Sequence, residues 1–339
     1  MPRSRAASLV LVAGALVSSC GPVPELSSKL GLRDGLVIAH RGASLHAPEH
    51  TLASYWLARQ LGSDFIELDV QLTRDGQIVV FHDDDPSRTT NAAKVFPGRE
   101  KGHVGSFTWA ELGQLDAGSW FNAAFPQRAR PSFARGLRVL RLSDALDIAE
   151  RKDEPGTPDL ATLPGLYIET KNPSESPGIE DKLVAELKAR QWITPEGQLM
   201  HGRKLVFQSF QELSLEKLRR LAPGVPRALL MEQEVDLDAA QARIERARAL
   251  GHGIGPHGMV TRQLKVLTAI PFAHAAHQRG LLVHPWVLNT PWQVRLWRWF
   301  GADGVISDAP DVALATLGRK TACPLDECLG KLDPWLSSR

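Results

Sequence analysis

The stretch FIELDVQLTRDGQIVVFH, residues 65–82, decides the fold class. Residues 65–72 and 77–82 are both β-type sequences rich in apolar residues, and Asp75-Gly76 lies between them. Asp-Gly between two such runs is a strong signal for a hairpin with a tight turn. The stretch therefore predicts two strands, one of which is an extra antiparallel arm beside a sheet.

The rest of the chain alternates short apolar runs with longer helical patterns. The strand candidates are 36–39, 65–72, 77–82, 166–171, 204–209, 227–231, 253–255, 281–287 and 304–307. Helical patterns separate most of them, at 52–61, 180–190, 214–221, 237–250 and 271–279. Repeated strand-then-helix order predicts an α/β fold with a parallel sheet inside and helices outside. Nine candidates exceed the eight strands of a TIM (β/α)8-type barrel by one, and the hairpin arm accounts for the surplus.

The composition suits one large barrel or two ordinary domains. The chain has 339 residues with 43% hydrophobic and 23% charged residues, which is enough apolar material for a large core. The net charge of +2 gives no electrostatic basis for binding nucleic acid, so no nucleic-acid partner is expected. Residues 86–142 lack β/α alternation, and we expect a small insertion there, after the His82 strand, over one mouth of the barrel.

The N-terminus has the features of an export signal. Two early arginines precede an apolar run at residues 6–17, which is too short for an ordinary transmembrane helix. The run ends in Val-Ser-Ser-Cys20, which resembles a bacterial lipobox. We therefore predict a lipoprotein signal peptide at 1–20 with lipidation at Cys20, and an ordinary cleaved signal is the alternative. The protein would be exported and anchored to a membrane facing the periplasm, and Gly21 favours the outer membrane.

Three further regions complete the predicted organisation. Residues 21–34 are rich in Pro, Ser and Gly and predict a tether, residues 35–318 form the barrel, and residues 319–339 form a C-terminal tail. The tail contains Cys323 and Cys328. In an oxidising compartment these cysteines can close a small loop, and two free thiols are the alternative.

Acidic side chains cluster at predicted strand ends. Glu67 and Asp69 are two residues apart, so on a strand their side chains point to the same face. Glu169 ends a later strand and supplies a third carboxylate. The C-terminal strand ends of a parallel barrel form its active-site face, and carboxylates without thiolates suit a hard cation. The sequence therefore predicts one divalent cation, Ca²⁺ or Mg²⁺.

Histidine and cationic side chains are expected beside these acids. A two-residue turn at Asp75-Gly76 would place His82 opposite Asp69, and His40 arrives from the neighbouring first strand. Two histidines can serve as general acid and general base near neutral pH. Arg41 and Lys171 can both bind a phosphate group. The planar guanidinium of Arg41 can form two parallel hydrogen bonds to it, and the ammonium group of Lys171 supplies a positive charge.

These motifs together resemble the glycerophosphodiester phosphodiesterase family. The matching blocks are HRG at 40–42, PEHT at 48–51, ELDV at 67–70, TRDG at 73–76, HD at 82–83, RTTN at 88–91, DAGSWF at 116–121, ETK at 169–171, QSF at 208–210 and GVISD at 304–308. The resemblance implies a TIM barrel that hydrolyses glycerophosphodiesters, such as glycerophosphocholine and glycerophosphoethanolamine, to glycerol 3-phosphate and an alcohol. His50 and His257 differ from the residues that are more usual in the family at these positions, so the resemblance does not fix the preferred head group.

The same resemblance implies a role for each site residue. His40 and His82 are the acid/base pair, Arg41 and Lys171 bind the phosphate, and the three carboxylates hold the metal. Trp286 is expected to line the pocket for the alcohol, since an aromatic face attracts a quaternary ammonium; packing within the barrel is the alternative. Two other functions stay open: a lysophospholipase-D-like phosphodiesterase acting on lysolipids, and a catalytically silent, surface-tethered binding protein.

Overall fold

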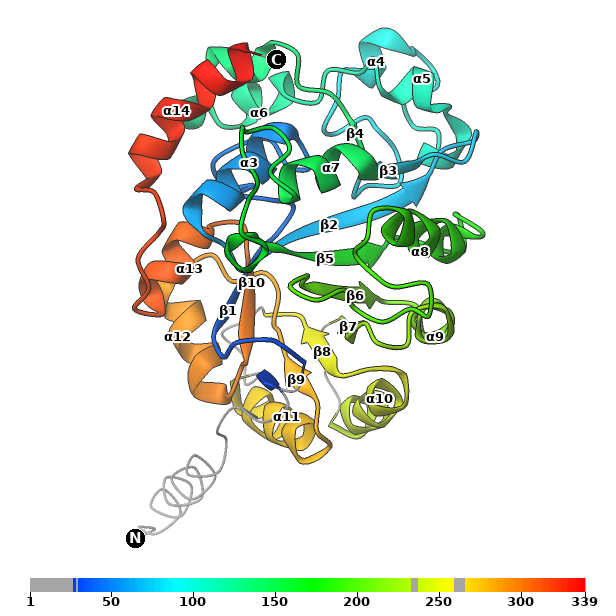
Figure 1. The fold of residues 1–339 in the computed structure, drawn as a ribbon, viewed down its shortest axis with the longest axis vertical. Coiled ribbons are helices and arrows are strands. Elements are labelled where there is room, and N and C mark those ends of the chain that lie inside the picture. Colours follow the sequence, from blue (N-terminus) through cyan, green and yellow to red (C-terminus); the bar gives the residue numbers. More distant parts are fainter. Residues whose placement is uncertain (1–26, 29, 233–236, 259–265, 339) are drawn as a thin grey trace, which may run out of the picture.

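A ring of parallel strands surrounded by helices dominates the computed structural model, which describes residues 27–28, 30–232, 237–258 and 266–338 (Figure 1). Within these ranges eight strands follow one another around the ring. They are β10 (Gly304–Ser307), β1 (Leu36–Ala39), β2 (Phe65–Leu72), β5 (Gly165–Thr170), β6 (Leu205–Ser209), β7 (Arg227–Met231), β8 (Gly253–Pro256) and β9 (Leu282–Val283).

The ring closes between β9 and β10. The Asp303 N–H donates to the Val283 carbonyl at 2.9 Å, and the Ile306 N–H donates to the Pro285 carbonyl at 3.0 Å. A closed ring of parallel strands has no exposed edge. The predicted (β/α)8-type barrel is confirmed.

The hairpin differs from the prediction by one residue. Strand β3 (Ile78–Val80) runs antiparallel to β2, and Leu72 pairs with Ile78. The turn between them has three residues, 74–76, and Gly76 adopts a left-handed φ of 76°. A three-residue turn with glycine in this conformation is a common hairpin type. The expected two-residue turn is therefore wrong, and the Phe81 N–H, not that of His82, bonds the Asp69 carbonyl, at 2.9 Å.

The irregular region after the hairpin contains a strand that the sequence did not reveal. β4 (Leu140–Arg141) pairs antiparallel with β3 and extends the sheet beside the barrel. Short helices fill the region between them: α4 (Ala92–Val95), η1 (Val104–Ser106), α5 (Trp109–Leu112), α6 (Ser119–Ala124), η2 (Pro126–Arg128) and η3 (Pro131–Ala134). Phe107 and Leu112 pack with Phe81 in a separate apolar cluster, which attaches this region to the end of the hairpin.

The outer helices bury one face against the strands. They are α3 (Leu52–Leu61), α7 (Leu142–Ala149), α8 (Ile179–Ala189), α9 (Glu212–Leu221), α10 (Leu237–Leu250), α11 (Val266–Gln278), α12 (Pro291–Phe300) and α13 (Pro310–Thr316). The two ends of helix α3 are set by capping residues. Thr51 and Ser54 form a capping box at its start, and Gly62 ends it with a left-handed φ of 84°.

Apolar side chains fill the interior of the barrel below its C-terminal end. Leu36, Phe65, Tyr167, Val206 and Leu282 point inward from five different strands and form one buried cluster. Tyr167 and Phe65 meet edge to face, with ring centroids 5.9 Å apart. The packed interior is a core and not a pore, so any ligand site must lie at the mouth.

Both ends of the described chain pack on the barrel. Helix α14 (Leu325–Ser337) lies against α3, where Trp335 stacks on Trp56 at a centroid distance of 5.2 Å. A disulfide joins Cys323 and Cys328 at the start of this tail. Within the segment predicted as a tether, Leu32 is buried against the barrel interior cluster. No helix in the described ranges has both the length and the apolar character needed to cross a membrane.

Candidate active site

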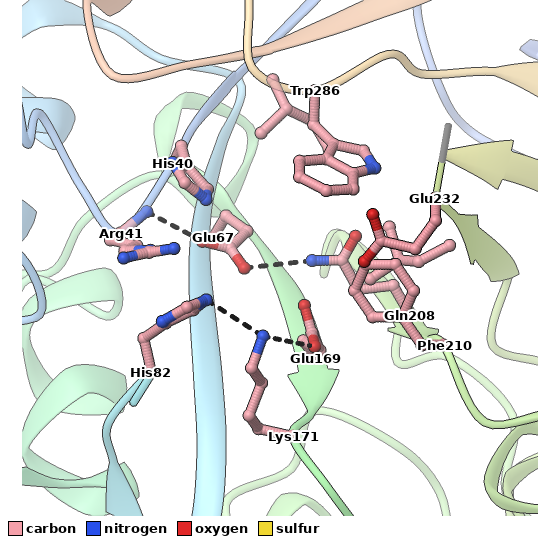
Figure 2. Close-up of a pocket in the computed structure, with 12 residues that line it drawn as sticks. His40, Arg41, Glu67, His82, Glu169, Lys171, Gln208, Phe210, Glu232 and Trp286 are labelled. Carbon is pink, nitrogen blue, oxygen red and sulfur yellow. Dashed lines mark hydrogen bonds and ion pairs between the residues drawn. The ribbon is translucent and has the colours of Figure 1, made fainter. Parts of the chain in front are cut away.

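A pocket of about 340 Å³ opens at the C-terminal ends of the barrel strands (Figure 2). Its walls come from residues that lie on, or within three residues after, β1, β2, β3, β5, β6, β7, β9 and β10. The lining residues are His40, Arg41, Glu67, His82, Glu169, Lys171, Gln208, Phe210, Leu230, Glu232, Trp286 and Ile306. The structure thus brings seven of the eight residues predicted for catalysis and for substrate and metal binding into one lining; the eighth, Asp69, lies beside it. Cys20, predicted to carry a lipid, lies outside the described residues.

Three carboxylates converge at the base of this pocket. Glu67 and Asp69 lie two residues apart on β2, so their side chains point to the same face. In the parallel pairing of β2 with β5, Asp69 is the direct neighbour of Glu169. One oxygen from each of the three lies within 4.8 Å of the others. Their exposed fractions are only 1%, 1% and 6%, so water cannot screen their mutual repulsion.

The hydrogen bonds of these acids leave room for a cation. Glu67 accepts from the backbone N–H of Arg41 at 2.8 Å and from the Gln208 side-chain amide at 3.0 Å. Asp69 accepts from His50 Nε2 at 2.8 Å through one oxygen. Its other oxygen, Oδ1, is buried and has no hydrogen-bond partner among the described residues. An orphaned carboxylate oxygen beside two more acids fits the ligand set of a hard divalent cation.

Burial and mutual repulsion shift the ionisation of the cluster. Burial, reinforced by Asp69, raises the pKa of Glu169 to about 8. Burial and the charges of Asp69 and Glu169 also raise the pKa of Glu67 well above its usual range. Burial opposes ionisation of Asp69 as well, but Lys171 and His82 hold its pKa well below the ordinary value. Of the three carboxyl groups, Asp69 is therefore the one whose pKa favours the ionised form.

These shifts predict a pH-dependent effect of the cation on stability. A carboxyl group whose pKa is higher in the folded than in the unfolded protein stabilises the fold below its ordinary value of 4.5, and that contribution is lost as the pH rises towards about 8. A bound cation compensates the charge that then appears. We expect the rise in Tm on adding Ca²⁺ or Mg²⁺ to chelator-treated protein to be larger at pH 8 than at pH 5.5. An equal or smaller rise at pH 8 would contradict the assignment of the cluster as a cation site.

His40 is fixed with one ring nitrogen free to face the pocket. Its Nδ1 lies 2.6 Å from Oδ1 of Asp308, and since a carboxylate only accepts, Nδ1 donates. Asp308 also accepts from the Asn289 amide at 2.6 Å and from the Ser44 hydroxyl at 3.0 Å. Burial and the adjacent Arg41 lower the pKa of His40, so its Nε2 is available as a base.

His82 reaches the pocket from irregular backbone two residues beyond the end of β3. Its Nδ1 donates to Oδ1 of Asp83 at 2.7 Å, and its Nε2 lies 3.0 Å from Nζ of Lys171. Because an ammonium group only donates, Nε2 of His82 accepts this bond. Lys171 also pairs with Glu169 at 3.3 Å, so it links the histidine to the carboxylate cluster.

Arg41 is held by a network of charges at the rim. Its guanidinium donates to Glu49 at 2.8 Å, and its backbone adopts a left-handed φ of 55°. Arg88 donates to both Glu49 and Asp83, which joins the Arg41 side of the site to the His82 side. Burial opposes ionisation of Glu49, but Arg88 and Arg41 lower its pKa to about 2. The network fixes the position of Arg41 on the pocket wall.

Trp286 also lies on the pocket wall. Its indole N–H donates to the Gly255 carbonyl at 2.8 Å, which leaves the ring partly exposed at the pocket.

Several residues of the site had no role assigned from sequence. His50 orients Asp69, Asp308 orients His40, and Gln208 bonds Glu67. Each lies inside a motif block quoted above: Gln208 on β6, Asp308 directly after β10, and His50 in the loop before α3. The sequence signal that could have identified Gln208 is its position on the strand β6, where it is the direct neighbour of Glu169 on β5.

Acids, imidazoles and cationic groups assembled at the mouth of a parallel barrel define a hydrolase that acts on a phosphate ester. The comparison with known families is specific: the sequence model of the glycerophosphoryl diester phosphodiesterase family matches residues 40–312. The chain belongs to this family and is a glycerophosphodiester phosphodiesterase.

Individual relatives agree with this assignment. A glycerophosphodiester phosphodiesterase of Bacillus subtilis is 36% identical over 278 residues, which is 82% of this chain and 84% of the relative. A solved phosphodiesterase of Oleispira antarctica superposes with a TM-score of 0.62 at 28% identity, covering 84% of this chain and 97% of that one. A family member from Silicibacter pomeroyi gives a TM-score of 0.67 at 25% identity, with coverage of 90% and 98%.

Proposed function

We propose that the enzyme uses one divalent cation, Ca²⁺ or Mg²⁺, to hydrolyse glycerophosphodiesters to glycerol 3-phosphate and an alcohol. The observation that carries the proposal is that one oxygen from each of Glu67, Asp69 and Glu169 lies within 4.8 Å of the others, and that Oδ1 of Asp69 is buried without a hydrogen-bond partner among the described residues. The Oleispira antarctica relative is described in complex with the product sn-glycerol 3-phosphate, which supports the product proposed for this chain.

The chain's own residues would bind and orient the phosphate. Arg41 and Lys171 lie on the same pocket wall as the histidines and carry the positive charge that a phosphodiester needs. When bound, the cation would act as a Lewis acid that polarises a phosphate oxygen. Glu49 holds Arg41, and Glu169 holds Lys171, so both cationic groups are positioned before the substrate arrives.

The two histidines would move the protons. One imidazole removes the proton of the attacking oxygen, and the other protonates the departing alcohol. Asp308 and Asp83 hold the Nδ1 atoms of His40 and His82, which directs each Nε2 away from its carboxylate partner. This arrangement fixes the tautomer of each ring and stabilises the imidazolium form when it appears.

The proposed reaction is tested by measuring glycerol 3-phosphate release from glycerophosphocholine, with and without a chelator. We expect turnover that the chelator abolishes and that added Ca²⁺ or Mg²⁺ restores. Release of a head group from lysolipids alone would favour the lysophospholipase-D-like alternative. No turnover of any phosphodiester with any divalent cation would favour the silent binding protein.

We also propose that the chain is exported and lipidated at Cys20, which anchors it to a membrane facing the periplasm. The support is the sequence pattern at 1–20, which lies outside the described residues. In a bacterial host, the protein is expected to incorporate a labelled fatty acid and to sediment with membranes, and the Cys20→Ser variant is expected to do neither. Labelling that survives Cys20→Ser would contradict the assignment.

A further inference from the structure

Helix α12 carries apolar side chains on both its inner and its outer face. On the inner face, Val294, Trp297 and Phe300 are buried in the apolar layer between the helices and the strands. On the outer face, Trp292 and Trp299 are 54% and 50% exposed. Single exposed apolar residues are normal on a protein surface, whereas tryptophans grouped on one helix face indicate a contact surface. The outer face of α12 has no role in the reaction described so far.

The exposed tryptophans belong to one stripe of side chains, which we call the outer stripe: Trp292, Arg295, Leu296 and Trp299. Residues three, four and seven positions apart lie on the same side of an α-helix. Arg295 is exposed and forms no hydrogen bond or ion pair within the described part of the chain. The helix contains no acidic residue. The outer stripe therefore combines two indole rings with an uncompensated positive charge.

We propose that the outer stripe of α12 binds the surface of an anionic phospholipid membrane. Tryptophan rings are amphipathic and accumulate at the level of the lipid head groups, and arginine is attracted to anionic lipids. A helix that lies in the membrane surface combines these residue types on one face. A second copy of the chain that paired through the same stripe would bring the two Arg295 side chains together, so like charges would repel.

The N-terminal part of the described chain reaches the same helix. Arg298 donates from two nitrogens to the two carboxylate oxygens of Asp34, each at 2.9 Å. Just upstream, the Leu32 N–H donates to the Ser27 carbonyl at 2.8 Å. The chain between Cys20 and Ser27 spans at most roughly 25 Å when fully extended. A lipid on Cys20 would therefore hold α12 close to the membrane; this step rests on the proposed lipidation, whereas the composition of the outer stripe does not.

The test measures contact between the outer stripe and lipid through tryptophan fluorescence. The full chain with Cys20→Ser, which cannot be lipidated, is mixed with vesicles of phosphatidylglycerol and phosphatidylcholine whose acyl chains are brominated near the head groups. Bromine quenches a tryptophan only at close contact, and residues 1–34 contain no tryptophan, so the N-terminal part gives no signal of its own. We expect brominated vesicles to quench the emission, and the combined Trp292→Phe and Trp299→Phe substitutions to remove most of this quenching.

Phenylalanine keeps the apolar character of the outer stripe, so these substitutions remove the fluorescent reporter and retain the surface. Trp109→Phe on α5 is the matched control, because it removes a half-buried tryptophan elsewhere, and it is expected to leave the quenching unchanged. Quenching of the same size in the Trp292→Phe, Trp299→Phe protein would show that other tryptophans meet the lipid and would overturn the proposal. Absence of quenching in the parent protein would also overturn it.

A second variant tests the charge. Arg295→Gln is expected to raise the lipid concentration for half-maximal quenching about fivefold, which is the usual contribution of one basic residue near an anionic surface. Arg220→Gln removes an exposed arginine from α9, which lies across the ring from α12 in Figure 1, and is expected to have no effect.

The remaining outcomes separate this surface from the proposed function. An Arg295→Gln curve that coincides with that of the parent protein would overturn the preference for anionic lipid. A dimer in solution that the tryptophan substitutions dissociate, without quenching by lipid, would assign the outer stripe to a second copy and overturn the membrane contact. None of these results bears on hydrolysis or on lipidation, which are followed separately by glycerol 3-phosphate release and by fatty-acid labelling.

Discussion

The Glu67→Gln variant is expected to lose about 10³-fold or more of kcat/KM for glycerophosphocholine, because a metal's charge stabilisation is worth several kcal/mol. Glutamine keeps the volume of the side chain and can still bond the Arg41 N–H and the Gln208 amide. It removes one negative charge from the three-carboxylate cluster, and with it a strong ligand for a divalent cation. The measurement is steady-state turnover with saturating Ca²⁺ or Mg²⁺, beside a thermal unfolding curve.

The unfolding curve separates a lost ligand from a lost fold. Because burial raises the pKa of Glu67, a neutral amide at this position relieves repulsion in the metal-free protein, so we expect its Tm to be no lower than that of the wild type. Glu175→Gln serves as the control for turnover, since its side chain is exposed. Turnover of Glu67→Gln within tenfold of the wild type would contradict the role of this carboxylate.

The second large effect is expected from the histidines. Replacing His82 or His40 by alanine is expected to lower kcat by a factor of about 10² to 10⁴, which is the usual contribution of one general acid or base. The two variants should differ with a substrate whose leaving group is p-nitrophenol, since this alcohol departs without being protonated. The variant that lacks the general acid will then lose much less activity than it does with glycerophosphocholine.

The control for these variants is His103→Ala, which removes an exposed histidine from the region after the hairpin. It is expected to keep wild-type turnover with both substrates. A His82→Ala variant that loses less than fivefold would show that this imidazole transfers no proton in the rate-limiting step. Equal losses with both substrates in both histidine variants would contradict the division into one acid and one base.

The acid cluster follows from strand periodicity, which is why the sequence could predict it. Side chains two apart on a strand share a face, so Glu67 and Asp69 had to lie together once β2 was recognised. The pairing of Asp69 with Glu169 follows from two parallel strands ending at the same edge. Regular structure fixes these positions, and no loop conformation intervenes.

The position of His82 could not be predicted in the same way. The register of a hairpin depends on the length of its turn, and one residue changes the face of every side chain. The turn includes Arg74 as well as Asp75-Gly76, so the ladder places Phe81 beside Asp69. His82 reaches the pocket because the chain leaves the ladder after Val80, a bend that strand periodicity does not encode.

The residues that orient the site were also beyond sequence reasoning. Asp308 follows β10 and meets His40, which follows the neighbouring strand β1, and His50 meets Asp69 from a loop in which its φ is 54°. Such pairs depend on loop conformations and on the closure of the ring. Each becomes evident only when the strands are placed around the barrel.

The most direct test of the central claim is to reconstitute the metal-free enzyme with cation. Protein stripped by a chelator is titrated with Mg²⁺ or Ca²⁺, while bound metal and glycerol 3-phosphate release are followed together. The account predicts that activity returns in proportion to a single bound ion per chain, and that Glu67→Gln weakens this binding. Full turnover by the metal-free wild-type enzyme would contradict the claim that these three carboxylates hold a catalytic cation.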